Sequence, residues 1–216
     1  MQESIQKALE VLRNGGIILY PTDTVWGIGC DATNPEAVAR IYEIKRRADS
    51  KSLVLLASDM DMIARYVKEI PEMAAQLVEV NDKPMTIIYP GAVVGPSPSP
   101  SQSPSELPTA ASPMRFPKPD RHTLAFNTVA EDGTVGIRIP MMDFCQQLVY
   151  KLGRPLVSTS ANISGEPTPK RYVEIAEEIR SAVDYVVDPS LEQGSTGQSS
   201  SIIKVGLDYS IEIIRK

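Results

Sequence analysis

The chain has 216 residues, of which 42% are hydrophobic, so it can bury one sizeable core and is short for two domains. Its formal net charge of -5 argues against a surface built throughout for nucleic acid, because neutralising phosphates requires an excess of Lys and Arg. The longest apolar runs are far below the roughly 18 to 20 residues of a membrane span, and none forms a secretory leader, so we expect one soluble cytoplasmic domain over residues 1–216 without a membrane partner.

The N-terminal region predicts a helix followed by a strand. Apolar residues recur at helical spacing over residues 5–12, and the Asn-Gly-Gly sequence at 14–16 ends this helix. The apolar run at 17–20 then predicts a strand.

The next region predicts a capped helix and two more strands. Asn34 is a candidate N-cap, and Pro35 suits the first helical turn. Strands are expected at 53–57 and 86–89, with helical material between them that Pro71 divides in two.

The second half of the chain is expected to be rich in strands. A helix is predicted over 142–152, and Thr168 and Pro169 repeat the cap-then-proline signal before a helix that runs to Ile179. Helices and strands mixed throughout, with a hairpin at the C-terminal end, indicate an α/β sheet that contains both parallel and antiparallel pairs. The strands expected here are 135–139, 156–158, 185–187, 201–205 and 211–214.

Residues 94–120 differ from the rest in composition. This segment holds eight of the chain's 18 prolines, many serines and almost no large apolar residue. Such a segment cannot bury enough surface to offset its ordering entropy, so we favour a flexible insertion. A substrate lid stays open as an alternative, because long loops within compact domains often cover sites.

The cysteines and the histidine exclude several kinds of site. Cys30 and Cys145 form no metal or disulfide spacing and are expected to be buried in a reducing compartment. The lone His122 excludes a multi-histidine metal centre and leaves few routes to a Ser-His-Asp hydrolase, so we expect it to be solvated.

Two segments of the first half could carry chemistry. The sequence YPTDTVWG at 20–27 follows a strand and offers hydroxyls, with glycines that permit close backbone approach, although its composition alone indicates a turn. The basic cluster of Lys45, Arg46, Arg47 and Lys51 is either a solvated helix end or a phosphate site, since Arg pairs two phosphate oxygens at once.

Two segments of the second half of the chain could also carry chemistry. In TVGIRIP at 134–140, Arg138 ends a buried strand, so it either meets an internal carboxylate or points into a site. The sequence PLVSTSANISG at 155–165 has the composition of a loop that binds anions through backbone N–H groups and hydroxyls.

Taken in order, these four segments resemble the signatures of the YrdC/TsaC family. They match PT[DE]TVYG, K-x-R-x-x-x-K-x-L, [TS]-V-G-[VI]-R-x-P and S-T-S-A-N-x-S-G followed by Thr168-Pro169, while the SSII sequence at 200–203 resembles the family's S-T-[VI]-[VI] ending. Trp26 stands where the family usually has Tyr, and Ala48 replaces a common Pro. The insertion after Gly91 is longer than is usual in the family.

The resemblance implies a twisted, open mixed sheet with flanking helices and a concave basic active-site face. It implies a short, single-domain L-threonylcarbamoyl-AMP synthase that uses L-threonine, bicarbonate or CO2, and ATP, with Mg²⁺ accompanying the nucleotide. The product would pass to a threonylcarbamoyl-transferase complex that modifies adenosine 37 of tRNAs reading ANN codons, and the enzyme itself would be able to contact tRNA.

The resemblance also implies roles for individual residues, with no protein metal ligand among them. The residues expected to be catalytic are Lys45, Arg47 and Arg138. Those expected to hold threonine are Thr24, Arg138 and Ser158, with Ser200 or Ser201 nearby. Those expected to contact ATP are Lys45, Arg47, Lys51, Thr134, Ser160, Asn162, Thr168 and Arg215.

Two rival hypotheses remain. One is a non-catalytic module on the same fold that binds double-stranded RNA or tRNA, which the acidic net charge argues against. The other is a carbamoyl-transfer enzyme related to hydrogenase maturation, whose similar domain normally lies within a much longer chain.

Overall fold

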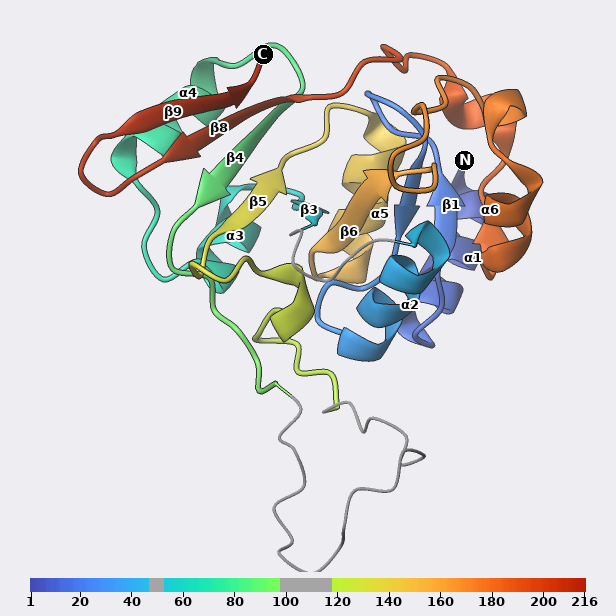
Figure 1. The fold of residues 1–216 in the computed structure, drawn as a ribbon, viewed down its shortest axis with the longest axis horizontal. Helices are drawn as coiled ribbons and strands as arrows, with labels where there is room; N and C mark the ends of the chain where they lie inside the picture. The colour runs from blue at the N-terminus through green and yellow to red at the C-terminus, as the bar shows by residue number, and fades with distance from the viewer. Residues whose placement is uncertain (47–52, 98–117) are drawn as a thin grey trace, which may run out of the picture.

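A computed structural model describes residues 1–46, 53–97 and 118–216 (Figure 1). Within these residues nine strands form one sheet in the order β7-β1-β2-β6-β3-β5-β4-β8-β9. The sheet contains both parallel pairs, such as β3 with β5, and antiparallel pairs, such as β3 with β6. The predicted mixed α/β sheet is therefore confirmed. The strands are β1 (Ile18–Tyr20), β2 (Gly27–Gly29), β3 (Val54–Leu56), β4 (Met85–Tyr89), β5 (Val135–Arg138), β6 (Leu156–Ser160), β7 (Tyr185–Val186), β8 (Ser201–Val205) and β9 (Ile211–Arg215).

Several helices begin and end where the sequence signals predict. The Asn34 side chain accepts hydrogen bonds from the first-turn N–H groups of Glu36 and Ala37, and Pro35 opens the helix. Asn14 closes the first helix, and Gly153 ends another in the left-handed conformation. The helices are α1 (Gln2–Arg13), α2 (Pro35–Lys45), α3 (Met60–Tyr66), α4 (Glu72–Val80), α5 (Asp143–Leu152) and α6 (Glu177–Ala182).

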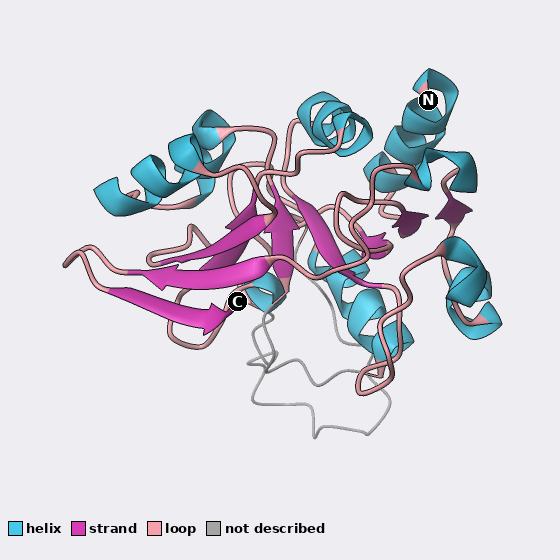
Figure 2. Cartoon of the chain, turned by 90° about the horizontal axis from the view of Figure 1, so that it is seen from above, coloured by secondary structure: helices cyan, strands magenta, loops and turns pink. Residues whose placement is uncertain are grey.

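Helices α1, α3, α4 and α5 lie on one side of the sheet, as Figure 2 shows from above. The side chains that the sheet turns toward them form the core, because neighbouring residues of a strand point to opposite faces. Leu55, Ile137 and Val157 are paired across β3, β5 and β6 and are fully buried. The residues that alternate with them face the other side of the sheet, where they are available to a site.

One predicted helix was wrong, and one strand was not predicted. The helix expected after Pro169 forms only a single 3-10 turn at Tyr172–Glu174, and α6 starts at Glu177. Ile175 and Ile179 are nevertheless buried, so the apolar pattern identified the inward side correctly. The segment read as a turn at 20–27 continues into an unexpected strand, β2, that pairs with both β1 and β6.

The predicted insertion at 94–120 lies mostly outside the described residues. At its base, Val94 pairs with Leu124, and the N–H of Gly95 donates to the Leu124 carbonyl at 2.8 Å. Cys30 and Cys145 are fully buried, as expected, and burial raises the pKa of both thiols. In the described part of the chain, no helix has both the length and the hydropathy needed to cross a bilayer.

Candidate active site

A pocket of about 260 Å³ opens over the sheet. Its floor comes from the strand residues that alternate with the core, so it lies on the face opposite helices α1 and α5. Ser158, Val54, Gly136 and Ile88 are successive partners across β6, β3, β5 and β4. The described residues that line it are Thr24, Val25, Trp26, Gly27, Leu53, Val54, Thr86, Ile88, Gly136, Arg138, Ser158, Thr159, Ser160, Ser199, Ser200, Ile202 and Arg215.

Gly136 keeps the centre of this floor open. A Cβ atom there would lie 3.4 Å from Cγ2 of Thr86 and about 4.0 Å from side-chain carbons of Ile88 and Val54. An alanine methyl group would thus fit closely, but a larger side chain would rise into the pocket. The glycine of the TVGIRIP sequence therefore maintains the pocket volume.

Arg138, at the end of β5, is the buried cation of the pocket. Its Nη1 donates to both carboxylate oxygens of Asp23, at 2.6 and 2.7 Å, and its Nη2 lies 3.4 Å from Oγ1 of Thr24. The side chains of Arg138 and Asp23 are only 3% and 8% exposed. A buried guanidinium is tolerated when it is paired in this way. Arg138 therefore satisfies both readings of the sequence, because it meets an internal carboxylate and also lines the pocket.

The loop before β2 is held in place by its own hydroxyl groups. Oγ1 of Thr22 and Oγ1 of Thr24 are 2.8 Å apart, and the Thr22 hydroxyl donates to the Val25 carbonyl at 2.7 Å. The Thr24 carbonyl accepts from the N–H of Gly197 and from the hydroxyl of Ser195. These bonds fix the position at which Thr24 enters the pocket.

Gly29, at the end of β2, allows the sheet to close beneath this loop. A Cβ atom there would lie 2.3 Å from the Val157 carbonyl and 2.7 Å from the Tyr20 ring. No other residue fits this contact. Burial raises the pKa of Tyr20, whose hydroxyl donates to the Val157 carbonyl at 3.2 Å.

Lys45, the last residue of α2, is buried beneath the loop that follows β6. Its Nζ donates to the backbone carbonyls of Ser160 at 2.5 Å and Asn162 at 2.6 Å. In return, the Lys45 carbonyl accepts from the N–H of Ser164. The ammonium group therefore stabilises the loop that carries Ser160 into the pocket.

Ser200 and Arg215 close the pocket on the side of the C-terminal hairpin. Oγ of Ser200 and Oγ1 of Thr86 are 2.8 Å apart, and Nε of Arg215 donates to the Ser200 carbonyl at 2.9 Å. Partial burial lowers the pKa of Arg215, but a guanidinium stays protonated in proteins. A second fixed cation thus lies on the wall supplied by β8 and β9.

Trp26 forms an aromatic wall whose orientation depends on Glu192. The indole Nε1 donates to Oε2 of Glu192 at 2.7 Å, and the same oxygen accepts from the Tyr172 N–H at 2.9 Å. The rings of Trp26 and Tyr172 are 5.2 Å apart between centroids. The Glu192 carboxylate therefore fixes the orientation of this wall.

This pocket is suited to binding anions and hydroxyl-rich ligands. Its described lining contains two arginines and seven Ser or Thr residues, with no carboxylate, cysteine or histidine. Fixed cations and hydroxyl donors can position and stabilise developing negative charge. In the described part of the chain, no group of three or more His, Cys, Asp or Glu residues could hold a metal ion.

Comparison with known proteins identifies the family. The profile of the Sua5/YciO/YrdC family, described as "Telomere recombination", matches residues 10–216. The chain belongs to this family.

Two curated relatives and one solved structure illustrate the similarity. Threonylcarbamoyl-AMP synthase of Vibrio cholerae is 30% identical over 189 residues, covering 86% of this chain and 85% of the relative. The protein of the same name from Photobacterium profundum is 25% identical over 214 residues, 99% of both chains. The crystal structure of P. abyssi Sua5 complexed with L-threonine matches with a TM-score of 0.70 and 26% sequence identity. The match covers 93% of this chain and 50% of the Sua5 chain.

The structure brings together some of the residues that the family resemblance selects. Those in the pocket lining are Thr24, Arg138, Ser158, Ser160, Ser200 and Arg215. Those described but outside the lining are Lys45, Thr134, Asn162 and Thr168. Arg47 and Lys51 lie outside the described residues. Thr134 is at the opposite end of β5 from Arg138, and its hydroxyl donates to Asp132 at 2.6 Å.

Sequence reasoning missed three residues that shape this site. Asp23 lay within a recognised motif, and only the three-dimensional pairing with Arg138 gives it a role. Glu192 lies in a segment without a motif, so no sequence signal links it to Trp26. Thr86 occurs within a predicted strand, and its hydroxyl contact with Ser200 depends on the parallel pairing of β4 with β8.

Proposed function

We propose that this protein is an L-threonylcarbamoyl-AMP synthase that forms threonylcarbamoyl-AMP and pyrophosphate from L-threonine, bicarbonate or CO2, and ATP. The observation that carries the proposal is the pocket in which buried Arg138 lies beside hydroxyl groups on the sheet face. The names of the curated relatives and the threonine complex of P. abyssi Sua5 support it. The enzyme would be a nucleotidyltransferase that works in the cytoplasm.

Arg138 provides the binding group for the amino-acid carboxylate. Asp23 and Thr24 hold one side of its guanidinium in place, so the direction of its remaining N–H donors is also fixed. Thr24, Ser158 and Ser200 supply hydroxyls for the polar groups of threonine. A volume of about 260 Å³ is below the range common for drug-sized ligands and suits an amino acid.

The reaction needs no nucleophile from the protein. The neutral amine of threonine attacks CO2 and releases a proton to water, which gives a carbamate. A carbamate oxygen then attacks the α-phosphorus of ATP as the bond to the pyrophosphate oxygen breaks. Positioning and charge stabilisation therefore supply catalysis. The hydroxyl and guanidinium groups of the described lining can provide both.

ATP is proposed to extend from Ser160 and Arg215 beyond the described lining, toward Asn162, Thr168 and Thr134. In the described structure the buried Oδ1 of Asn162 has no hydrogen-bond donor. Lys45 would contribute to ATP binding indirectly, by stabilising the loop that follows β6. Arg47 and Lys51 are proposed as phosphate contacts from the sequence alone.

Mg²⁺ would enter with the nucleotide. The described lining offers hydroxyl oxygens but no carboxylates, so phosphate oxygens and water would supply most ligands. The ion would neutralise phosphate charge.

Pyrophosphate release from ATP by the purified protein, with Mg²⁺ and bicarbonate, tests the proposal. L-threonine should be required, and L-serine should give less release because it lacks the methyl group that distinguishes the two substrates. A matched reaction without an amino acid sets the background. Arg47→Ala should lower this activity strongly while leaving the fold intact.

Failure of pyrophosphate release by the folded protein would overturn the synthase proposal. Strong RNA binding without ATP turnover would instead support the non-catalytic module. Adenylate formation from carbamoyl phosphate without threonine would support the carbamoyl-transfer alternative. Transfer of the product to tRNA by a separate complex is a further part of the proposal.

A further inference from the structure

A second pocket, of about 670 Å³, lies among the ends of helices α1, α3 and α5. It belongs to the helical layer, whereas the hydroxyl pocket lies over the opposite face of the sheet. Four arginines line it, Arg13, Arg65, Arg121 and Arg154, together with His122 and the turn that ends α5. Nothing in the proposed synthase reaction uses this pocket.

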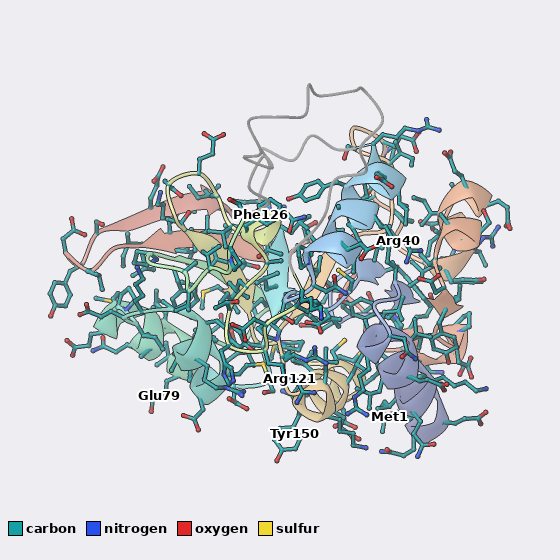
Figure 3. All side chains as sticks on the ribbon, turned by 90° about the horizontal axis from the view of Figure 1, so that it is seen from below. Met1, Arg40, Glu79, Arg121, Phe126 and Tyr150 are labelled. Atoms are coloured by element: carbon teal, nitrogen blue, oxygen red, sulfur yellow. The ribbon has the colours of Figure 1, made fainter. Side chains whose placement is uncertain are left out.

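The four arginines come from four separate segments of the chain. Arg13 ends α1, Arg65 lies in the last turn of α3, and Arg154 follows the turn after α5. Arg121 lies in a loop that the Tyr66 hydroxyl fixes by donating to the Arg121 carbonyl at 2.6 Å. Figure 3 views the molecule from below and shows Arg121 beside α5. The fold therefore gathers these cations.

Most of this positive charge is not balanced by carboxylates. Arg154 forms an ion pair with buried Asp31, but Arg13, Arg65 and Arg121 form no ion pair within the described residues. The nearby Asp120 accepts a hydrogen bond from the backbone N–H of His122 at 3.0 Å. The described lining contains no carboxylate.

Helix dipoles explain only part of this arrangement. A cation in the last turn of a helix interacts favourably with its C-terminal carbonyls, which accounts for Arg13 and Arg65 individually. Arg121 and His122 lie in a turn and are not part of any helix end. Like charges that share one pocket repel each other, so a bound anion would offset a repulsion that the helix ends do not remove.

We infer that this pocket binds a phosphate group, either of a small phosphorylated molecule or of an RNA backbone. Guanidinium groups suit phosphate because their planar forks donate to two oxygens at once. Arg13 is held by its bond from Nη2 to the Lys151 carbonyl at 2.9 Å, and Arg65 lies 6.0 Å from the Tyr66 ring centroid. These contacts hold both side chains in position, and each guanidinium has further N–H donors for a ligand.

The test compares the full-length protein with the double variant Arg65→Gln and Arg121→Gln. Both side chains are exposed and lack ion pairs in the described structure, so their loss should not prevent folding. The control is Lys7→Gln with Lys83→Gln, which removes the same charge from exposed positions outside both pockets. The probes are inorganic pyrophosphate, followed by calorimetry, and a short RNA duplex, followed by fluorescence anisotropy.

Occupancy of the first pocket can be followed separately, because Trp26 lines it and is the single tryptophan of the chain. The Arg variant should bind at least one probe about 10-fold to 100-fold more weakly than the control, with unchanged pyrophosphate release from ATP and threonine. If RNA is the natural ligand, the slope of log affinity against log salt should also fall by roughly 2.

Loss of pyrophosphate binding alone would show that the bound phosphate group belongs to a small phosphorylated molecule. Loss of RNA affinity would identify the RNA backbone. The inference is wrong if the Arg variant binds both probes as tightly as the control. Should the double variant fail to fold, Arg121→Gln alone must show the same loss at about 10-fold for the inference to stand.

Discussion

The carboxylate of Asp23 holds Arg138 through two contacts from one guanidinium nitrogen, at 2.6 and 2.7 Å, in a nearly solvent-free position. The two residues are 115 positions apart in the chain. Their pairing joins the loop before β2 to the end of β5. The same contact orients the cation proposed to bind threonine.

Asp23→Asn should impair both stability and substrate binding. It leaves a buried guanidinium without a charged partner, which costs about 3 kcal/mol or more in the free energy of unfolding. The KM for threonine should rise because Arg138 loses its fixed orientation. Urea unfolding and threonine-dependent pyrophosphate release measure the two effects. Glu178→Gln, which breaks the exposed pair with Arg46, is the control and should cost less than about 1 kcal/mol.

Glu192→Gln should leave the indole ring of Trp26 less firmly oriented. The change replaces a charged acceptor that serves both the indole N–H and the Tyr172 N–H, and each such bond contributes about 1.5 to 3 kcal/mol. Emission from this single tryptophan should shift, and threonine or ATP should bind several-fold more weakly in fluorescence titrations. An identical spectrum and affinity would show that Glu192 does not orient the wall.

Lys45→Met should lower activity through the loop after β6. Methionine preserves much of the side-chain volume but cannot donate to the Ser160 and Asn162 carbonyls. We expect kcat/KM for ATP to fall by about 10-fold or more, since each tenfold corresponds to roughly 1.4 kcal/mol. Lys204→Met removes an exposed ammonium group and should change kcat/KM by less than about twofold.

Gly136→Val should block the pocket while preserving the sheet. Valine is favourable in strands, but its methyl groups would project from the floor beside Thr86. Threonine binding should be lost, with little change in the melting temperature. Gly136→Ala adds only the first carbon and should retain partial binding. Equal threonine affinity in all three proteins would show that threonine does not lie over this floor.

The carboxyl group of Asp132 should titrate far below neutral pH. The hydrogen bond from the Thr134 hydroxyl, followed by that from Lys204, lowers the pKa of Asp132 to about 2. Because the folded-state pKa is depressed, this stabilisation is complete above the ordinary value of 3.8 and is lost as the pH falls toward about 2. Carboxyl NMR should give this pKa, and Thr134→Val should raise it. An unchanged pKa in the variant would contradict the assigned cause.

Local sequence signals predicted much of the fold because their causes are local. Asn34 and Pro35 set the start of α2 through capping and backbone geometry, and Asn14 closes α1. In contrast, β2 has three residues with a glycine at each end, so neither periodicity nor strand propensity could reveal it. It exists because β1 and β6 pair with it on both sides.

The candidate site could be predicted only in part for the same reason. The ordered motifs placed Thr24, Arg138 and Ser158 in one pocket. They could not reveal which carboxylate pairs with Arg138, or that Glu192 contacts Trp26, because these contacts depend on how distant segments pack. The family resemblance assigned residues to a reaction, whereas their distances required the folded chain.

The strand order also has a consequence for how quickly the protein reaches its working state. Ile18 pairs with Tyr185 and Thr86 with Ile202, so many pairings must wait for distant parts of the chain to meet. The entropy of closing such large loops slows folding. A pocket lined by residues of β2, β3, β4, β5, β6, β8 and β9 is therefore completed late. Substrates should therefore slow unfolding without accelerating folding, because no earlier species presents the full set of contacts.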